Sequence, residues 1–166
     1  KGVNELVAAF EALAKSNRSL KLVLVGAPEE DLDPLKEITK RSIKSNTNII
    51  SVGWQNDVRP FLSIADLFVF PSYREGFPNV VLQAGAMGLP SIVTNINGCN
   101  EIIEHNKNGW IIEVKNTNGL FNAMQSFIEG KKELEFDKEQ IRKHIASRYG
   151  RSEIWNLILD EYKALA

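Results

Sequence analysis

The sequence predicts an α/β fold in which a doubly wound parallel sheet is followed by helices at the carboxyl end. Short apolar runs alternate with amphipathic segments along most of the chain, the order that produces parallel strands joined by helices. The apolar runs are nearly continuous, as expected for strands covered by helices on both faces. A length of 166 residues is that of one ordinary domain. We therefore expect residues 1–166 to form a single domain.

The first half of the chain supplies two predicted strands and three predicted helices. Residues 3–16 place apolar side chains on one helical stripe, which predicts an amphipathic helix. Residues 21–25 and 48–52 are short apolar runs, each followed by glycine, and predict strands. A polar helix at 34–45 and a short helix at 57–65 follow these strands in turn.

The second half continues the same alternation and then becomes helical. Residues 67–70 predict a strand that proline ends, and a helix at 78–87 follows. Residues 91–94 and 110–113 predict two more strands, with a short helix at 101–105 between them. The chain closes with three predicted helices, at 120–129, 134–148 and 152–164.

Composition excludes several classes of function. Twenty basic residues balance 21 acidic ones, so there is neither the basic excess of a nucleic-acid binder nor a polybasic membrane patch. The single cysteine, Cys99, has no partner for a disulfide or a zinc site, which predicts a reducing, cytoplasmic compartment. No apolar run approaches the ~20 residues of a membrane-spanning helix.

A parallel sheet of this kind binds ligands outside the carboxyl ends of its strands. The candidate loops are therefore 26–33, 53–57, 71–79 and 94–100. Among them, the loop at 71–79 leads into a predicted helix whose first turn holds Pro78.

Residues 71–90 carry the strongest chemical signal. Free N–H groups at the start of the helix suit a phosphate or a sugar hydroxyl. Asn79 and Gln83 lie four residues apart and so share a helical face, and Gly76 would let a ligand approach the backbone. Glu75 could accept hydroxyls or face a developing positive charge. The residues alone leave a second interpretation equally open, an ordinary turn at Glu75 and Gly76 before a core helix.

Weaker signals have simpler interpretations. Asp31 and Asp33 have the Asp-x-Asp spacing of a metal site, but Asp33 before proline predicts a helix cap. Cys99 has no neighbouring base that would lower its pKa, which predicts an inert thiol. His105 and His144 stand alone in the sequence and are expected on the surface. The mixed charges from 131 to 151 predict a solvated helix face.

The string at 72–79, Ser-Tyr-Arg-Glu-Gly-Phe-Pro-Asn, resembles the acidic motif of retaining glycosyltransferases with the GT-B fold, most closely those of family four. Other segments resemble the carboxyl-terminal domain of these enzymes in the same order: 1–3, 21–26, 48–53, 65–72, 88–90, 97–103 and 108–110. The resemblance implies a Rossmann-like domain, the carboxyl-terminal half of a GT-B fold. It also implies a longer two-domain enzyme whose amino-terminal acceptor domain is absent here, so that residues 1–166 alone transfer nothing.

The resemblance assigns roles by position. Lys1, which would neutralise the leaving diphosphate, and Glu75, which would contact the donor sugar, are the implied catalytic residues. The donor would also be held by Gly53, Trp54, Gln55, Arg74, Gly76, Phe77, Pro78, Asn79 and Gln83. Trp54 could instead pack on the sheet edge, and a solvated Arg74 is the favoured alternative to a phosphate contact. No cofactor or metal ion is implied.

The implied reaction moves a sugar, with retention, from a nucleotide-sugar, in particular a UDP-sugar, to a glycan or a polyprenyl-diphosphate-linked acceptor. The motifs look most like those of bacterial enzymes that build capsule, lipopolysaccharide or O-antigen, acting peripherally at the inner face of the cytoplasmic membrane. A sugar-nucleotide epimerase of the same architecture and a non-catalytic nucleotide-sugar-binding domain are the alternatives.

Two departures from the family pattern bear on these expectations. The second glutamate of the motif is replaced by Gln83, which removes the charge from a ribose contact. The family also has a strand and an arginine before the lysine that matches Lys1. That strand would lie between the strands at 21–25 and 67–70, so we expect these residues alone not to complete the sheet.

Overall fold

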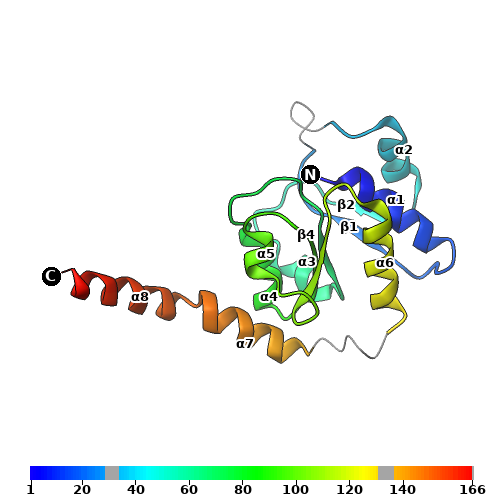
Figure 1. The fold of residues 1–166 in the computed structure, drawn as a ribbon. Helices are drawn as coiled ribbons and strands as arrows, with labels where there is room; N and C mark the ends of the chain where they lie inside the picture. The colour runs from blue at the N-terminus through cyan, green and yellow to red at the C-terminus, as the bar shows by residue number, and fades with distance from the viewer. Residues whose placement is uncertain (29–33, 131–136, 166) are drawn as a thin grey trace.

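A computed structural model describes residues 1–28, 34–130 and 137–165, and its body is a sheet layer between two layers of helices (Figure 1). Helices α1 (Val3–Ala14) and α6 (Thr117–Ile128) pack together on one face of the sheet. Helices α4 (Asn79–Ala86), α5 (Cys99–Ile102) and α7 (Lys138–Tyr149) lie on the other. The expected α/β class with parallel strands and carboxyl-terminal helices is confirmed.

The strands divide into two parallel sheets. Strand β1 (Leu22–Leu24) pairs with β2 (Ile49–Ser51), and helix α2 (Glu37–Ser45) connects them. Strands β3 (Phe68–Phe70), β4 (Ser91–Thr94) and β5 (Gly109–Ile112) form the second sheet in that order, and helix α3 (Arg59–Ile64) precedes β3. Within the described residues β1 and β3 each keep one unpaired edge, as expected if a strand between them comes from elsewhere.

Strand β4 forms the centre of the core. All four of its residues are buried, and alternation along a strand sends successive side chains to opposite faces. Ile92 packs with α1 and α6, whereas Val93 packs with α4, α5 and α7, and both are fully buried. This strand matches the expectation of helices on both faces.

The expectation of complete coverage is wrong for the first sheet. Leu22 and Leu24 pack toward α1, but Val23 on the opposite face is 37% exposed and Ile50 beside it is 44% exposed. No helix among the described residues covers that face, because α3 is short and packs instead against Ala84, Leu89 and Phe68.

Several helix boundaries differ from the sequence prediction because caps decide them. Helix α5 begins at Cys99, two residues early, since Gly98 adopts a left-handed φ of 75° and its N–H donates to Glu101 Oε1 at 3.1 Å. Asn116 caps α6, and Asp137 caps α7 by accepting from two backbone N–H groups.

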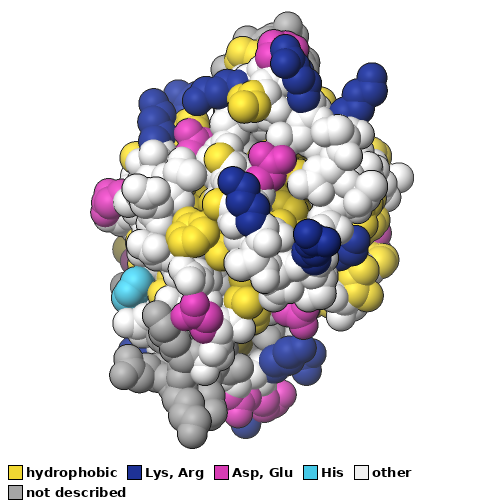
Figure 2. Space-filling view, turned by 90° about the vertical axis from the view of Figure 1, so that its right-hand side faces the viewer, with side chains coloured by type: hydrophobic (Ala, Val, Ile, Leu, Met, Phe, Trp, Pro, Cys, Tyr) yellow, Lys and Arg dark blue, Asp and Glu magenta, His cyan; other side chains and the backbone are white. Residues whose placement is uncertain are grey.

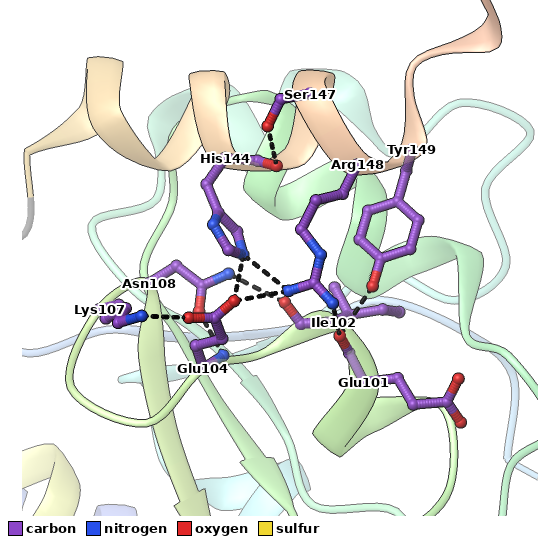
Figure 3. Close-up of polar contacts among 9 residues, drawn as sticks. All are labelled: Glu101, Ile102, Glu104, Lys107, Asn108, His144, Ser147, Arg148 and Tyr149. Atoms are coloured by element: carbon purple, nitrogen blue, oxygen red, sulfur yellow. Dashed lines mark hydrogen bonds and ion pairs between the residues drawn. The ribbon is translucent and has the colours of Figure 1, made fainter. Parts of the chain in front are cut away.

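Polar contacts fasten α7 to the segment that follows α5 (Figure 3). Arg148 Nη1 lies 2.6 Å from Glu104 Oε1, and Lys107 Nζ lies 2.6 Å from Glu104 Oε2. These contacts lower the pKa of Glu104, the Lys107 hydrogen bond most strongly. Tyr149 adds a hydrogen bond to the Glu101 carbonyl at 2.7 Å. Arg148 is nevertheless exposed, as expected for a solvated charged face, and residues 131–136 of that charge run lie outside the described residues.

Helix α8 (Arg151–Ala164) extends away from the body (Figure 1). Every described residue in it is exposed, including the apolar side chains Ile154, Trp155, Leu157, Ile158, Leu159 and Tyr162. Neither α8 nor any other helix in the described part of the chain has the length and apolar character needed to cross a membrane.

Candidate functional site

Strand register brings the candidate loops together. Phe70 pairs with Val93 in the parallel β3–β4 ladder, so the loops that follow these strands leave the same edge side by side. At Gly98, a Cβ atom would collide with the backbone carbonyl of Gly76. The loop after β4 therefore supports the loop that carries Glu75, and only glycine fits at the contact.

The structure brings Lys1 and Glu75 together across 74 residues of sequence. Lys1 Nζ lies 3.3 Å from Glu75 Oε1, with side-chain exposures of 46% and 19%. Gly2 makes this approach feasible: it is buried against the Pro71 backbone with a left-handed φ of 71°. The two residues expected to be catalytic thus form one ammonium–carboxylate pair at the start of the site.

A buried hydroxyl also holds Glu75. Ser72, 1% exposed, donates through Oγ to Glu75 Oε1 at 2.7 Å. Tyr73, the next residue, donates to Glu5 Oε2 on α1 at 2.6 Å, so the loop is fixed on two sides. Neither contact was predicted from the sequence. A serine three residues before the glutamate is the only sequence signal of the first contact, and the second has none.

The start of α4 lies immediately after Glu75. Pro78 is buried and extended at the N-cap, so the prediction that it belongs to the first helical turn is wrong by one residue. Asn79 is exposed at the first helical position, where backbone N–H groups have no partner within the helix. Phe77 is 45% exposed, and its ring centroid lies 5.7 Å from that of Tyr149 on α7.

Gln83 lines a crevice of about 410 Å³ with residues 56–59, which the sequence analysis did not select individually. Two of these, Asp57 and Arg59, form a bidentate pair with both hydrogen bonds at 2.8 Å. The Arg59 hydrogen bonds lower the pKa of Asp57 to about 2, so the pair stays ionised at neutral pH. Asn79, which was expected to share a helical face with Gln83, does not line this crevice.

The loop after β2 forms another part of the site. The Gly53 carbonyl accepts from the Gly26 N–H at 2.8 Å, which joins the ends of β1 and β2. Gln55 donates to the Val52 carbonyl at 2.8 Å and so braces its own loop. Trp54 is 68% exposed, so its alternative interpretation as packing on the sheet edge is wrong.

Arg74 and Gly76 occupy the most open part of the loop. Both are exposed, and a Cβ atom at Gly76 would meet nothing within 4 Å. The space beside Gly76 is therefore open to a ligand. The exposure of Arg74 matches the favoured interpretation of a solvated side chain.

Cys99 lies buried beneath this loop. Burial, and to a smaller extent the negative charge of Glu75, raises the pKa of its thiol to about 11 from an ordinary value of 9.0. The thiol is therefore protonated at neutral pH, as expected for an inert cysteine.

We expect Cys99 to resist alkylation while the chain is folded. Iodoacetamide at pH 8 should modify it at least about tenfold more slowly than in urea-unfolded chain, because thiolate is the reactive form and the sulfur is buried. The unfolded thiol ionises first, so its stabilising contribution is present below pH 9 and lost as the pH rises toward 11. Mass spectrometry of timed samples measures the rate, and equal rates in both states would contradict the burial.

The histidines have structural contacts. His105 is exposed, as expected, and its Nδ1 accepts from the Ile111 N–H at 3.0 Å. His144 is partly exposed, at 22% of its side chain, and its Nε2 lies 3.5 Å from Glu104 Oε1 at the surface (Figure 3). Across residues 1–28, 34–130 and 137–165, no three His, Cys, Asp or Glu side chains gather as metal ligands. Asp31 and Asp33 lie outside the described residues.

Comparison with known proteins identifies the family of this chain. The sequence model of the family "Glycosyl transferases group 1" matches residues 1–144. The capsular polysaccharide biosynthesis glycosyltransferase CapM of Staphylococcus aureus is 25% identical over 98% of this chain and 42% of its own length. An Escherichia coli UDP-Gal:alpha-D-GlcNAc-diphosphoundecaprenol alpha-1,3-galactosyltransferase is 35% identical over 61% of this chain and 26% of its own.

A solved structure shares the fold. HepE of Anabaena, crystallised with UDP, superposes with a TM-score of 0.82 at 21% identity, over 96% of this chain and 44% of its own; a second crystal contains UDP-glucose. The chain spans less than half the length of these relatives. Because the family model covers most of the sequence, the chain belongs to the group 1 glycosyl transferases.

Proposed function

We propose that this chain is the nucleotide-sugar-binding domain of a retaining glycosyltransferase that uses a UDP-sugar. The observation that carries the proposal is the pair formed by Lys1 and Glu75 beside the start of α4. Transfer of a sugar from a nucleotide leaves a diphosphate, and stabilising that developing negative charge is the main catalytic task.

Each member of the pair suits one side of the breaking bond. The Lys1 ammonium supplies positive charge for the diphosphate, and the unpaired N–H groups at the start of α4 add hydrogen bonds. The Glu75 carboxylate accepts sugar hydroxyls and faces the positive charge that develops at the anomeric carbon. Open space at Gly76 admits the sugar against the backbone.

The crevice at Gln83 is the proposed place for the nucleoside. Its volume of about 410 Å³ falls within the range of small-molecule sites. The Gln83 amide can bond a ribose hydroxyl, although without the strength of a charged acceptor. Exposed Trp54, on the loop after β2, is the proposed flank of the base.

The whole protein is proposed to be a two-domain enzyme of bacterial surface-polysaccharide synthesis. Its amino-terminal domain would bind a glycan or polyprenyl-diphosphate-linked acceptor at the inner face of the cytoplasmic membrane. The unpaired edges of β1 and β3 support a contribution from a further segment, because a strand placed there would join both sheets. Residues 1–166 alone are proposed to bind the donor but not to transfer its sugar.

Calorimetric titration of this chain with UDP, GDP and ADP, with and without magnesium, tests the proposal. We expect UDP to bind best, because the proposed donor is a UDP-sugar. Binding should not depend on magnesium, because Lys1 and the N–H groups at the start of α4 supply positive charge for the diphosphate. Asn79→Ala should weaken UDP binding about tenfold, the usual effect of removing a hydrogen bond to a charged group. Glu37→Gln on α2 is the matched control and should bind like the unsubstituted chain.

A non-catalytic binding domain remains the second candidate because Gln83 lines the crevice where the family has glutamate. In the same titration, a large gain in UDP affinity for Gln83→Glu would favour that candidate. Binding of none of the three nucleotides would contradict both. The family match favours glycosyl transfer over the epimerase alternative.

A further inference from the structure

We propose that Ser72 is a positioning residue for Glu75. Its hydroxyl fixes one oxygen of the Glu75 carboxylate, so that the other oxygen is presented to the sugar of a bound donor. This inference rests on the proposed function, which it deepens by assigning the two carboxylate oxygens different tasks.

Both polar contacts of the Glu75 side chain are made to one of its two carboxylate oxygens. Ser72 Oγ lies 2.7 Å from Oε1, and Lys1 Nζ lies 3.3 Å from the same atom. No described residue forms a hydrogen bond or ion pair with Oε2. The side chain is 19% exposed, so Oε2 is the oxygen that remains to meet a ligand.

The serine is itself held rigidly. It is buried, and its backbone carbonyl accepts a hydrogen bond from the Thr94 hydroxyl at the end of β4. Thr94 is also buried, at 1% exposure. The Tyr73–Glu5 hydrogen bond fixes the next residue toward α1. The fixed backbone and the burial of the side chain together restrict where the Ser72 hydroxyl oxygen can lie.

Two acceptors lie near the Ser72 hydroxyl, and the one to which it bonds more strongly favours a role in positioning Glu75. If the hydroxyl only needed a hydrogen-bond partner, either acceptor would serve. The Arg74 carbonyl also lies within reach of Ser72 Oγ, but at 3.5 Å, the limit of a hydrogen bond. The bond to the carboxylate is shorter and charge-assisted, and therefore stronger. A glutamate held in one rotamer before binding loses less conformational freedom when the ligand arrives.

Nuclear magnetic resonance of the free chain tests positioning without any ligand. Side-chain couplings of Glu75 should report one χ1 rotamer in the unsubstituted chain and averaged rotamers in Ser72→Ala. Ser72→Thr, which keeps the hydroxyl, should restore the single rotamer, and Ser63→Ala, which removes an exposed hydroxyl, should change nothing. If the added methyl prevents folding, Thr94→Val against Thr94→Ser provides a second pair. Unchanged couplings in Ser72→Ala would overturn the proposal.

Binding then tests the consequence. We expect Ser72→Ala to reduce the affinity for UDP-glucose or UDP-galactose about tenfold relative to UDP, because the presented oxygen meets the sugar. In the Glu75→Gln background the same substitution should have little further effect, since the interaction between the presented carboxylate oxygen and the sugar is already lost. A Glu75→Gln chain that binds both sugar nucleotides normally would refute the inference while leaving UDP binding intact. Failure to bind UDP at all would instead refute the proposed function, and the couplings would still decide the role of Ser72.

Discussion

Replacing Gly98 by alanine should lower the free energy of unfolding by about 3 kcal/mol and displace the loop that carries Glu75. Two costs combine at this position. A left-handed φ of 75° costs a residue with a Cβ atom about 1–2 kcal/mol. The new Cβ atom would also collide with the Gly76 carbonyl and approach Pro78 Cδ to 2.8 Å. Urea unfolding followed by circular dichroism measures the change.

Gly130→Ala is the matched control because it separates these two costs. Gly130 also has a left-handed φ, 58°, but a Cβ atom there would meet nothing within 4 Å. Only the backbone cost remains, so the loss should be about 1 kcal/mol. Equal losses in the two variants would show that contact between the loops at Gly76 and Gly98 contributes nothing to stability.

Glu75→Gln should reduce sugar transfer by the proposed two-domain enzyme about 100-fold or more, while UDP affinity changes little. Removing one preorganised electrostatic partner of a developing charge typically has an effect of this size. The amide keeps the shape of the side chain and can still accept from Ser72, so the fold should be preserved. Initial rates with the donor selected by titration, measured at saturating acceptor, give the comparison.

The same transfer assay includes one control variant and one further variant of the Lys1–Glu75 pair. Glu37→Gln removes a carboxylate from exposed α2, outside the site, and should transfer at the unsubstituted rate. Lys1→Met should reduce transfer as well, because the leaving diphosphate would lose its proposed positive partner. Normal transfer by Glu75→Gln would exclude a catalytic role for this carboxylate.

The sequence predicted the elements well because each depends on local periodicity. The run at 91–94 appears as β4, and the stripe at 3–16 contains α1. Boundaries were less accurate where caps decide them. The early start of α5 depends on a left-handed Gly98 and a bond to Glu101 that periodicity does not contain. The open face at Val23 depends on which helices are present to cover it.

Residues of the candidate site could be selected from the sequence, whereas most contacts between them could not be predicted. Family resemblance identified Lys1 and Glu75, and the fold places them 3.3 Å apart. Ser72 and Thr94 escaped notice because their roles depend on the β3–β4 register, which brings together residues 22 positions apart. The part that residues 56–59 play in lining the crevice was also not predicted, because it depends on the packing of α3 beside α4.

Helix α8 gives the molecule a long axis. Fourteen helical residues span about 21 Å, a length that exceeds the ~15 Å radius of gyration of a compact domain of this size. The chain should therefore tumble anisotropically in water, more slowly end over end than about the axis of α8. Amide relaxation in the sheet would then depend on how each N–H vector lies relative to that axis, so a single correlation time would not describe the domain.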